Sequence, residues 1–267
     1  MVAAGPVSYN GNHRGHPRLR NVSSDDFDIS IEDWAYMDTL HIEEAIHCLA
    51  VEQGESTIED GTALVAGQVT SNHERTSVSF PSSFSTTPVA FSDAQTYNHS
   101  RPVVTRQPKI SESGFVVRLQ GSERRSSHET EDIGYVAIEP GTGTANGRAF
   151  EVGVQSGIDH EWSTIEFDGT YTEPAFIADM QTVAGPDSSG LRYRNLTESS
   201  VDVRVEEEQS NDDEVVHVEE DVGYLVAGAV SSEATPSPSP EPSAPEGETG
   251  EGDGFGVDEY GVDRFGV

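Results

Sequence analysis

The sequence predicts an all-β chain of three tandem antiparallel β-sandwich repeats, followed by a linker and a short docking tail. Three copies of one segment support this prediction. Each begins with His, has Glu three residues later and continues into an apolar run. The copies begin at His41, His128 and His217, which lie 87 and 89 residues apart. Before each copy, apolar and polar residues alternate, as is typical of a half-buried strand. Internal repetition at a near-constant spacing indicates an array of similar units.

The repeated segments also set the predicted boundaries along the 267 residues. The ranges are repeat one at 1–70, repeat two at 71–153, repeat three at 154–230, a linker at 231–253 and a docking tail at 254–267. A repeat of this size buries only a modest core, so contacts between repeats or subunits are expected to contribute to stability.

The strands are expected in the same order in each repeat. An aromatic strand opens the second repeat at Val78–Phe80 and the third at Ile165–Phe167. A short polar segment and then an Arg follow, at Arg18, Arg106 and Arg192. The alternating strand comes next, at Phe27–Glu32, Phe115–Gln120 and Val201–Glu206. The His-x-x-Glu turn then leads into an apolar strand such as Tyr135–Ile138.

The first repeat is predicted to lack its opening strand. Tyr9 matches Tyr97, and Phe80 lies 17 residues before Tyr97, so the first repeat's counterpart of Phe80 would precede Met1. An unpaired sheet edge invites pairing with another strand. We expect a neighbouring subunit, the C-terminal tail or a virion partner to complete it.

The charge balance indicates the solvent in which the chain works. It has 15 basic and 48 acidic residues, a net charge of −33, and Lys109 is its one lysine. Many carboxylates with almost no lysine is typical of proteins that work in molar salt, where repulsion is screened within a few ångströms. The chain has no basic face for nucleic acid. We expect no signal peptide, since residues 1–10 lack a basic region and an apolar stretch, and we expect no membrane insertion, since no apolar stretch is long enough.

The end of the chain is predicted to be a separate device. Residues 231–253 are rich in Pro, Ser, Glu and Gly, which is typical of an extended linker. An aromatic-Gly-Val unit then recurs with its rings at Phe255, Tyr260 and Phe265. Aromatic rings are good docking anchors because they bring a large apolar area with few rotatable bonds. The alternative is a disordered end, which would not call for aromatic residues.

The strand pattern resembles the H-type lectin domain. The matching residues are Val78, Phe80, Phe84 and Pro88 in the opening strand, Gly114–Phe115 in the alternating strand and Gly134–Ile138 in the last. The resemblance implies a six-stranded antiparallel sandwich, assembled into trimers or hexamers that bind glycans at subunit junctions. The Trp that often follows the alternating strand is present as Trp34 and missing from the other two repeats. The tail resembles the C-termini of structural proteins from tailed viruses of halophilic archaea.

The repeated His and Glu residues form the first candidate site. They are His41, Glu44, His128, Glu131, His217 and Glu220. A zinc site needs three or four ligands in a defined geometry, and residues three apart on a strand point to opposite faces. We therefore favour a turn in which His and Glu hydrogen-bond each other or the backbone, with no metal. No catalytic motif is present, so we expect no enzyme and no cofactor. A metalloenzyme built on these pairs is an additional hypothesis, beside the two functions given at the end of this section.

A second candidate site follows the alternating strand of the first repeat. Trp34, Tyr36, Asp38 and His41 lie close together there. A ring that stacks on a sugar beside a carboxylate that accepts hydroxyl bonds is a common glycan site. The alternative is that Trp34 packs beneath the loop.

These observations lead to two hypotheses for function. The first is an exterior virion protein of a haloarchaeal tailed virus, a spike, turret, fibre or baseplate element. It would form a homo-oligomer, contact other virion proteins through its first repeat or tail, and bind a host glycan or surface-layer glycoprotein. Repeated weak contacts would add up to avidity. The alternative is a cellular carbohydrate-binding lectin of a halophilic archaeon without a virion role.

Overall fold

The computed structural model describes residues 1–37 and 41–230, without the side chain of residue 230. It confirms an all-β chain with several small antiparallel sheets, and the described residues form one helical turn, η1 (Glu123–Arg125). None of the described helices is long and apolar enough to cross a membrane. Asp38, the predicted linker and the three aromatic residues of the predicted docking tail lie outside the described residues.

The strands fall into three groups, which we call repeats 1, 2 and 3. Repeat 2 contains β5 (Gly54–Thr57), β6 (Ala63–Ser71), β7 (Thr76–Ser79), β8 (Val89–Ala94), β9 (Val103–Ser111), β10 (Gly114–Gly121) and β11 (Glu131–Ile138). Its sheets have the orders β5-β6-β11-β8 and β7-β10-β9. The aromatic residues of the predicted opening strand fill the core, where the ring of Phe80 contacts Phe84, Phe115 and Tyr135.

Repeat 3 has the same strand order as repeat 2. Its strands are β12 (Gly141–Ala145), β13 (Arg148–Ile158), β14 (Ser163–Glu166), β15 (Tyr171–Met180), β16 (Ser189–Arg194), β17 (Ser200–Glu207) and β18 (Glu220–Val230). One sheet runs β12-β13-β18-β15, and β14, β17 and β16 are neighbours in the other. Its core contains Phe167, Tyr171, Phe176 and Tyr224.

Repeat 1 is smaller than its two neighbours. It consists of β1 (Val2–Ser8), β2 (Gly15–Arg20), β3 (Asp28–Asp33) and β4 (Ile46–Ala50), paired as β1-β4 and β2-β3. Among the described residues it has no counterpart of β5, β6 or β7, so three strands are absent where the sequence predicted one. Within the described part of the chain, β3 and β4 form outer edges of their sheets. Completion of these edges by another strand stays a prediction.

The strand pairing also moves the repeat boundaries. The predicted divisions at 70 and 153 fall inside β6 and β13, which pair along β11 and β18 of the following repeat. The local pattern could not show this because the partners lie about 70 residues further along the chain. Repeats 2 and 3 therefore each have an apolar strand, β6 or β13, ahead of the aromatic one.

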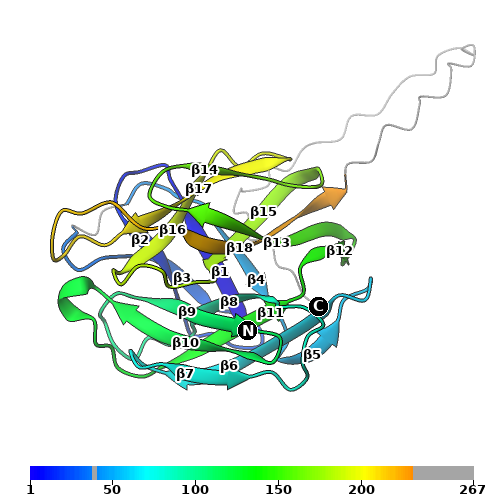
Figure 1. Ribbon diagram of the computed structural model, residues 1–267, viewed down its shortest axis with the longest axis horizontal. Coiled ribbons are helices and arrows are strands. Elements are labelled where there is room, and N and C mark those ends of the chain that lie inside the picture. The colour runs from blue at the N-terminus through cyan, green and yellow to red at the C-terminus, as the bar shows by residue number, and fades with distance from the viewer. Residues whose placement is uncertain (38–40, 231–267) are drawn as a thin grey trace, which may run out of the picture.

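The three repeats surround a common centre in a propeller-like ring. Strand β1 runs through the middle of the molecule, between repeat 2 and repeat 3 (Figure 1). It pairs in parallel with β16, at Val7↔Arg192 and Ser8↔Tyr193, so one five-stranded sheet, β14-β17-β16-β1-β4, crosses from repeat 3 to repeat 1. A shared apolar cluster contains Leu49, Phe91 and Ile177, one from each repeat. Each repeat also has an apolar cluster of its own, and the shared cluster joins the three at the centre.

Candidate functional site

Three buried ion pairs join the repeats into a closed ring. Each links an Arg of one repeat to a Glu of the next: Arg18 to Glu131 at 2.9 Å, Arg106 to Glu220 at 2.8 Å, and Arg192 to Glu44 at 3.0 Å. All six side chains are at most 1% exposed. The third pair leads from repeat 3 back to repeat 1, so all three junctions are closed within one chain.

Each of these glutamates is held in the same way within its own repeat. A hydroxyl group at the end of β1, β8 or β15 donates to the carboxylate, from Ser8, Thr96 and Thr182 respectively. Two successive backbone N–H groups donate as well, from residues 10 and 11, 98 and 99, and 184 and 185. A buried carboxylate is tolerated only when such partners satisfy it. The repeated Glu is therefore a junction residue.

Glu220 has one further hydrogen-bond donor, the side chain of His217. Burial by itself would raise its pKa, but hydrogen bonds from His217 and Thr182 and the charge of Arg106 lower the pKa to about 2. His217 lies between two carboxylates, with Nδ1 2.5 Å from Glu207 and Nε2 3.2 Å from Glu220. Burial by itself would lower the pKa of His217, but these hydrogen bonds outweigh burial and raise it.

The other repeated His residues have different partners. His41 bonds Asp33, whereas His128 bonds the backbone oxygens of Glu129 and Arg101. These unlike surroundings match the structural interpretation of the His-x-x-Glu segment better than a metal site repeated three times. The partner that the sequence did not reveal is the Arg of the preceding repeat. Its signal was present, since one Arg recurs at the same place in each repeat of a strongly acidic chain.

The predicted glycan residues of repeat 1 do not form an exposed platform. Trp34 is 2% exposed and packs on His16, with ring centroids 4.7 Å apart. Tyr36 is 40% exposed, and its hydroxyl accepts a hydrogen bond from the backbone of Gln209 in repeat 3. The packing alternative therefore describes Trp34, because a ring buried in this way cannot stack on a sugar.

A different aromatic ring is exposed where repeats 1 and 2 meet. Tyr97 is 38% exposed, and the guanidinium groups of Arg18 and Arg20 lie 5.0 and 4.7 Å from its ring centroid. An open hollow of about 380 Å³ adjoins the ring, and the polar side chains around it include Arg20, Glu32, Asp33 and His41. The hollow thus combines a ring face with hydrogen-bond donors and acceptors from two repeats.

The junction of repeats 3 and 1 carries a second cluster of this kind. Tyr9 and Trp162 make an edge-to-face contact at 5.3 Å. Arg194 lies 4.2 Å from the Trp162 centroid, and Arg204 lies 4.5 Å from that of Tyr9. At the junction of repeats 2 and 3, Val183 takes the place of Tyr9 and Tyr97, so that junction has no ring at this position.

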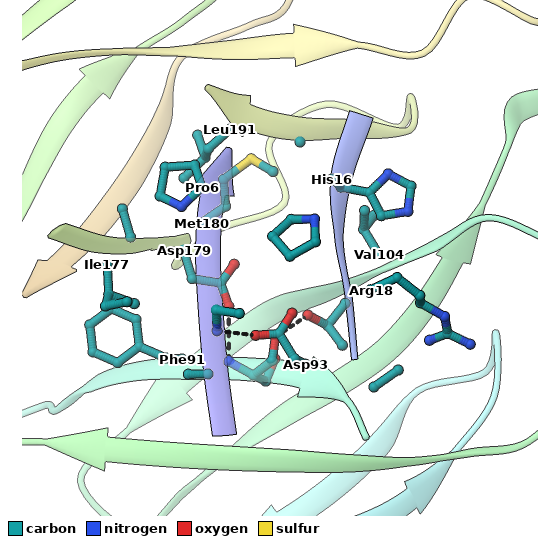
Figure 2. Close-up of a pocket in the computed structure, with 18 of the residues that line it drawn as sticks. Pro6, His16, Arg18, Phe91, Asp93, Val104, Ile177, Asp179, Met180 and Leu191 are labelled. Atoms are coloured by element: carbon teal, nitrogen blue, oxygen red, sulfur yellow. Dashed lines mark hydrogen bonds between the residues drawn. The ribbon is translucent and has the colours of Figure 1, made fainter. Parts of the chain in front are cut away.

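A small cavity lies at the centre of the ring. It has a volume of about 60 Å³ and is lined by β1, β2, β8, β9, β15 and β16, two strands from each repeat. Figure 2 shows Asp93 and Asp179 pointing toward the same space from β8 and β15. The Asp93 carboxylate accepts from the Ala4 N–H at 2.8 Å, and Asp179 accepts from the Ser92 N–H at 3.1 Å.

Both carboxyl groups are disfavoured as anions in this cavity. Burial among protein atoms raises the pKa of Asp179 to about 7, against the effect of its hydrogen bonds. Burial likewise raises the pKa of Asp93, and the charge of Asp179 adds to the effect. The repeat 1 residue at the sequence position of Asp93 and Asp179 is Gly5, whose φ is +94°. A Cβ there would lie 2.6 Å from Pro17 Cγ, so a larger residue does not fit. The cavity therefore holds two carboxyl groups, which the sequence analysis missed although Asp-x-Gln recurs at 93–95 and 179–181.

Comparison with known proteins gives one informative similarity. No family model matches the chain, and no solved structure matches it. Among curated proteins, halomucin of Haloquadratum walsbyi is 35% identical over 238 residues, which cover 86% of this chain. The chain spans about 2% of the length of halomucin, so it is similar to one segment of a far larger protein. The similarity places the chain beside a protein of a halophilic archaeon, as the acidic composition indicated.

Proposed function

We propose that this chain is a saccharide-recognition module of a halophilic system, in which three H-type-lectin-like sandwiches are joined as a covalent pseudo-trimer. The support is the shared strand order of repeats 2 and 3, the aromatic spacing that resembles H-type lectins, and the cyclic Arg–Glu pairing. In that family, glycans bind at subunit junctions, and here the junctions lie between repeats of one chain.

The observation that carries this proposal is the pairing of rings with arginines at two junctions. An exposed ring offers its face to the C–H face of a sugar, while guanidinium and carboxylate groups bond its hydroxyls. Tyr97 with Arg20 supplies these groups between repeats 1 and 2, and Tyr9 with Trp162 and Arg194 supplies them between repeats 3 and 1. Val183 supplies no ring between repeats 2 and 3. We therefore expect two saccharide sites per chain.

Two settings fit such a module. The similarity to a segment of halomucin favours a cellular surface protein of a halophilic archaeon. The aromatic-Gly-Val repeats of the predicted docking tail favour the exterior of a tailed virus, with the tail as the attachment to the particle. Recognition by the repeats is the same in both, and multiplication of the sites by association of chains would raise avidity.

The test is binding of the purified protein to the isolated surface layer of an extremely halophilic archaeon in molar salt. We expect saturable binding that periodate oxidation of the surface glycans removes. Tyr97→Ala and Tyr9→Ala should each lower the number of sites by half, and the double variant should abolish binding. Val183→Ala is the matched control and should bind as the parent does. The proposal would be refuted if both tyrosine variants bound as the parent does, or if the parent did not bind.

The setting is tested separately by fractionation. A chain truncated after Val230 should still bind the surface layer. If only the full chain sediments with virus particles, the virion setting is supported. If neither chain does and cells retain both, the cellular setting is supported.

A further inference from the structure

Three carboxylates of repeat 3 lie close together. Asp187 precedes β16, Glu207 ends β17, and Glu214 lies in the long segment between β17 and β18. One oxygen from each lies within 4.8 Å of the others. None of the three has an Arg or Lys partner within the described ranges 1–37 and 41–230, and the basic side chain that contacts one of them is His217, on Glu207.

Glu207 gives a second, independent observation. It is 3% exposed, and one of its oxygens is 2.5 Å from His217. Its other oxygen, Oε2, is buried and has no hydrogen-bond partner. A buried carboxylate oxygen without a partner is costly, and such a group in a folded protein calls for a bound ion or water. The orphan oxygen belongs to the best-buried member of the cluster.

The surroundings are also strongly negative. Glu123 of η1 lies close enough to Asp187, Glu207, Glu208 and Asp212 for their charges to act on it. Burial and the charges of Glu208 and Asp187 raise the pKa of Glu123 to about 7. The counterparts in repeat 2 are Arg101, Gly121 and Arg125, so repeat 2 has no such cluster at this place.

We propose that Asp187, Glu207 and Glu214 bind one calcium ion. Oxygen ligands select hard cations such as calcium and magnesium. Calcium–oxygen distances of about 2.3–2.6 Å place opposite ligands about 5 Å apart, whereas magnesium requires about 4.2 Å. The three oxygens lie within 4.8 Å of one another, which is inside the span of one calcium coordination sphere. Calcium is favoured over magnesium because it accepts irregular oxygen coordination. Water molecules would supply the remaining ligands.

The ion would fasten the segment after β17 to its surroundings. That segment reaches repeat 2, because the Glu123 N–H donates to Glu208 at 2.7 Å and the Arg124 N–H donates to Ser210 at 3.3 Å. Calcium on Glu207 and Glu214 would hold both ends of this stretch, and so would stabilise the junction between repeats 2 and 3. This is the junction whose ring is replaced by Val183.

The test is calcium binding to the full chain in molar potassium chloride, by calorimetric titration and by thermal unfolding with calcium or chelator. We expect one calcium per chain and a rise in unfolding temperature of several degrees. Glu214→Gln should bind calcium at least about tenfold more weakly and lose the temperature rise, because Glu214 is an exposed ligand. Glu219→Gln, an equal charge change in the same segment, is the control and should bind as the parent does.

Three outcomes would overturn the assignment. One is an unfolding temperature that is equal with calcium and with chelator. The second is equal calcium affinity for Glu214→Gln and Glu219→Gln. The third is a rise in unfolding temperature when sodium replaces potassium, with no further rise when calcium is added. A monovalent ion would then occupy the site. Asp187→Asn is a second variant, and it should weaken calcium binding as Glu214→Gln does.

Discussion

At the residue scale, the molecule contains two kinds of enclosed carboxylate. Glu44, Glu131 and Glu220 each have an Arg, a hydroxyl group and two N–H donors. At Glu220, partners of this kind lower the pKa of the carboxyl group despite burial. Asp93 and Asp179 have fewer donors and face each other across the central cavity, so the proton is retained. The difference in partners, at similar depth, decides the sign of each pKa shift.

Loss of one junction pair should be strongly destabilising. Arg106→Met leaves the Glu220 charge buried without its cation, so we expect a loss of roughly 3–5 kcal/mol in the free energy of unfolding. Arg194→Met breaks a pair with Asp202 in which the Arg side chain is 41% exposed, and should cost about 1 kcal/mol or less. Denaturant unfolding at one fixed salt concentration measures both. Equal losses would contradict the junction role.

The central carboxyl group should make stability depend on pH. The pKa of Asp179 is about 7 in the folded chain, against the ordinary aspartate value of 3.8 in the unfolded chain. Between these values the unfolded chain releases the proton and the folded chain keeps it, so stability falls as pH rises from about 4 to 7. Asp179→Asn should therefore be more stable than the parent at pH 8, by roughly 2–4 kcal/mol, and equal to it near pH 4.

A control of opposite sign is available for this pH experiment. Burial acts to raise the pKa of Asp202, but hydrogen bonds from Thr164, Asn195 and Arg194 lower it. Asp202→Asn should therefore lose stability at neutral pH, and the loss should fade as the solution becomes acidic. Unfolding of both variants as a function of pH tests the assignment. An Asp179→Asn variant that is less stable than the parent at pH 8 would contradict it.

At the element scale, the sequence pattern located the alternating strands well. The expected strands at 115–120 and 201–206 are β10 and β17, and that at 27–32 is β3. Their period-two alternation reflects one face on a core, which is a local property. It did not locate β6 and β13 within their repeats, because their assignment depends on pairing with β11 and β18. Both pairings place a Tyr opposite a Gly, Tyr135 on Gly67 and Tyr224 on Gly153.

The Gly–Tyr pairs give a prediction about strand packing. A Cβ at Gly67 would lie 2.4 Å from the Tyr135 hydroxyl oxygen, so Gly67→Ala must displace the ring from the core of repeat 2. We expect a loss of roughly 1–3 kcal/mol from this overpacking. Gly190→Ala in β16 is the control, since nothing lies within 4 Å of its Cβ position. Thermal unfolding compares the two, and a tolerant Gly67→Ala would contradict the packing argument.

At the scale of the whole molecule, the ring is closed by contacts between residues far apart in the chain. Strand β1 of repeat 1 pairs with β16 of repeat 3, and all three repeats share one apolar cluster. The resemblance to H-type lectins implies trimers or hexamers of chains, and in this structure three similar units already lie within one chain. Association of chains is not needed to close the junctions, and it stays a prediction.

The shared centre predicts a single cooperative unfolding transition. A chain without residues 1–53 would lose Arg18 and Glu44, which leaves Glu131 without its Arg and Arg192 with Glu206 alone, and it should unfold at a much lower temperature. A chain truncated after Val230 keeps all six residues of the three junction ion pairs and should unfold as the full chain does. Differential scanning calorimetry measures all three. Separate transitions for the repeats, or an unchanged transition without residues 1–53, would show that the repeats are independent.

The sequence by itself determined the β class, the threefold repetition and adaptation to salt, because alternation, spacing and charge are written locally along the chain. It also marked the residues of the junctions, through the recurring Arg and the recurring Glu. Only the tertiary structure decided that each Arg meets the Glu of the next repeat, that Trp34 is buried while Tyr97 is exposed, and that Asp93 and Asp179 share one cavity. These features depend on how the repeats are placed around a common centre, and that placement follows from burying surface between segments far apart in the chain.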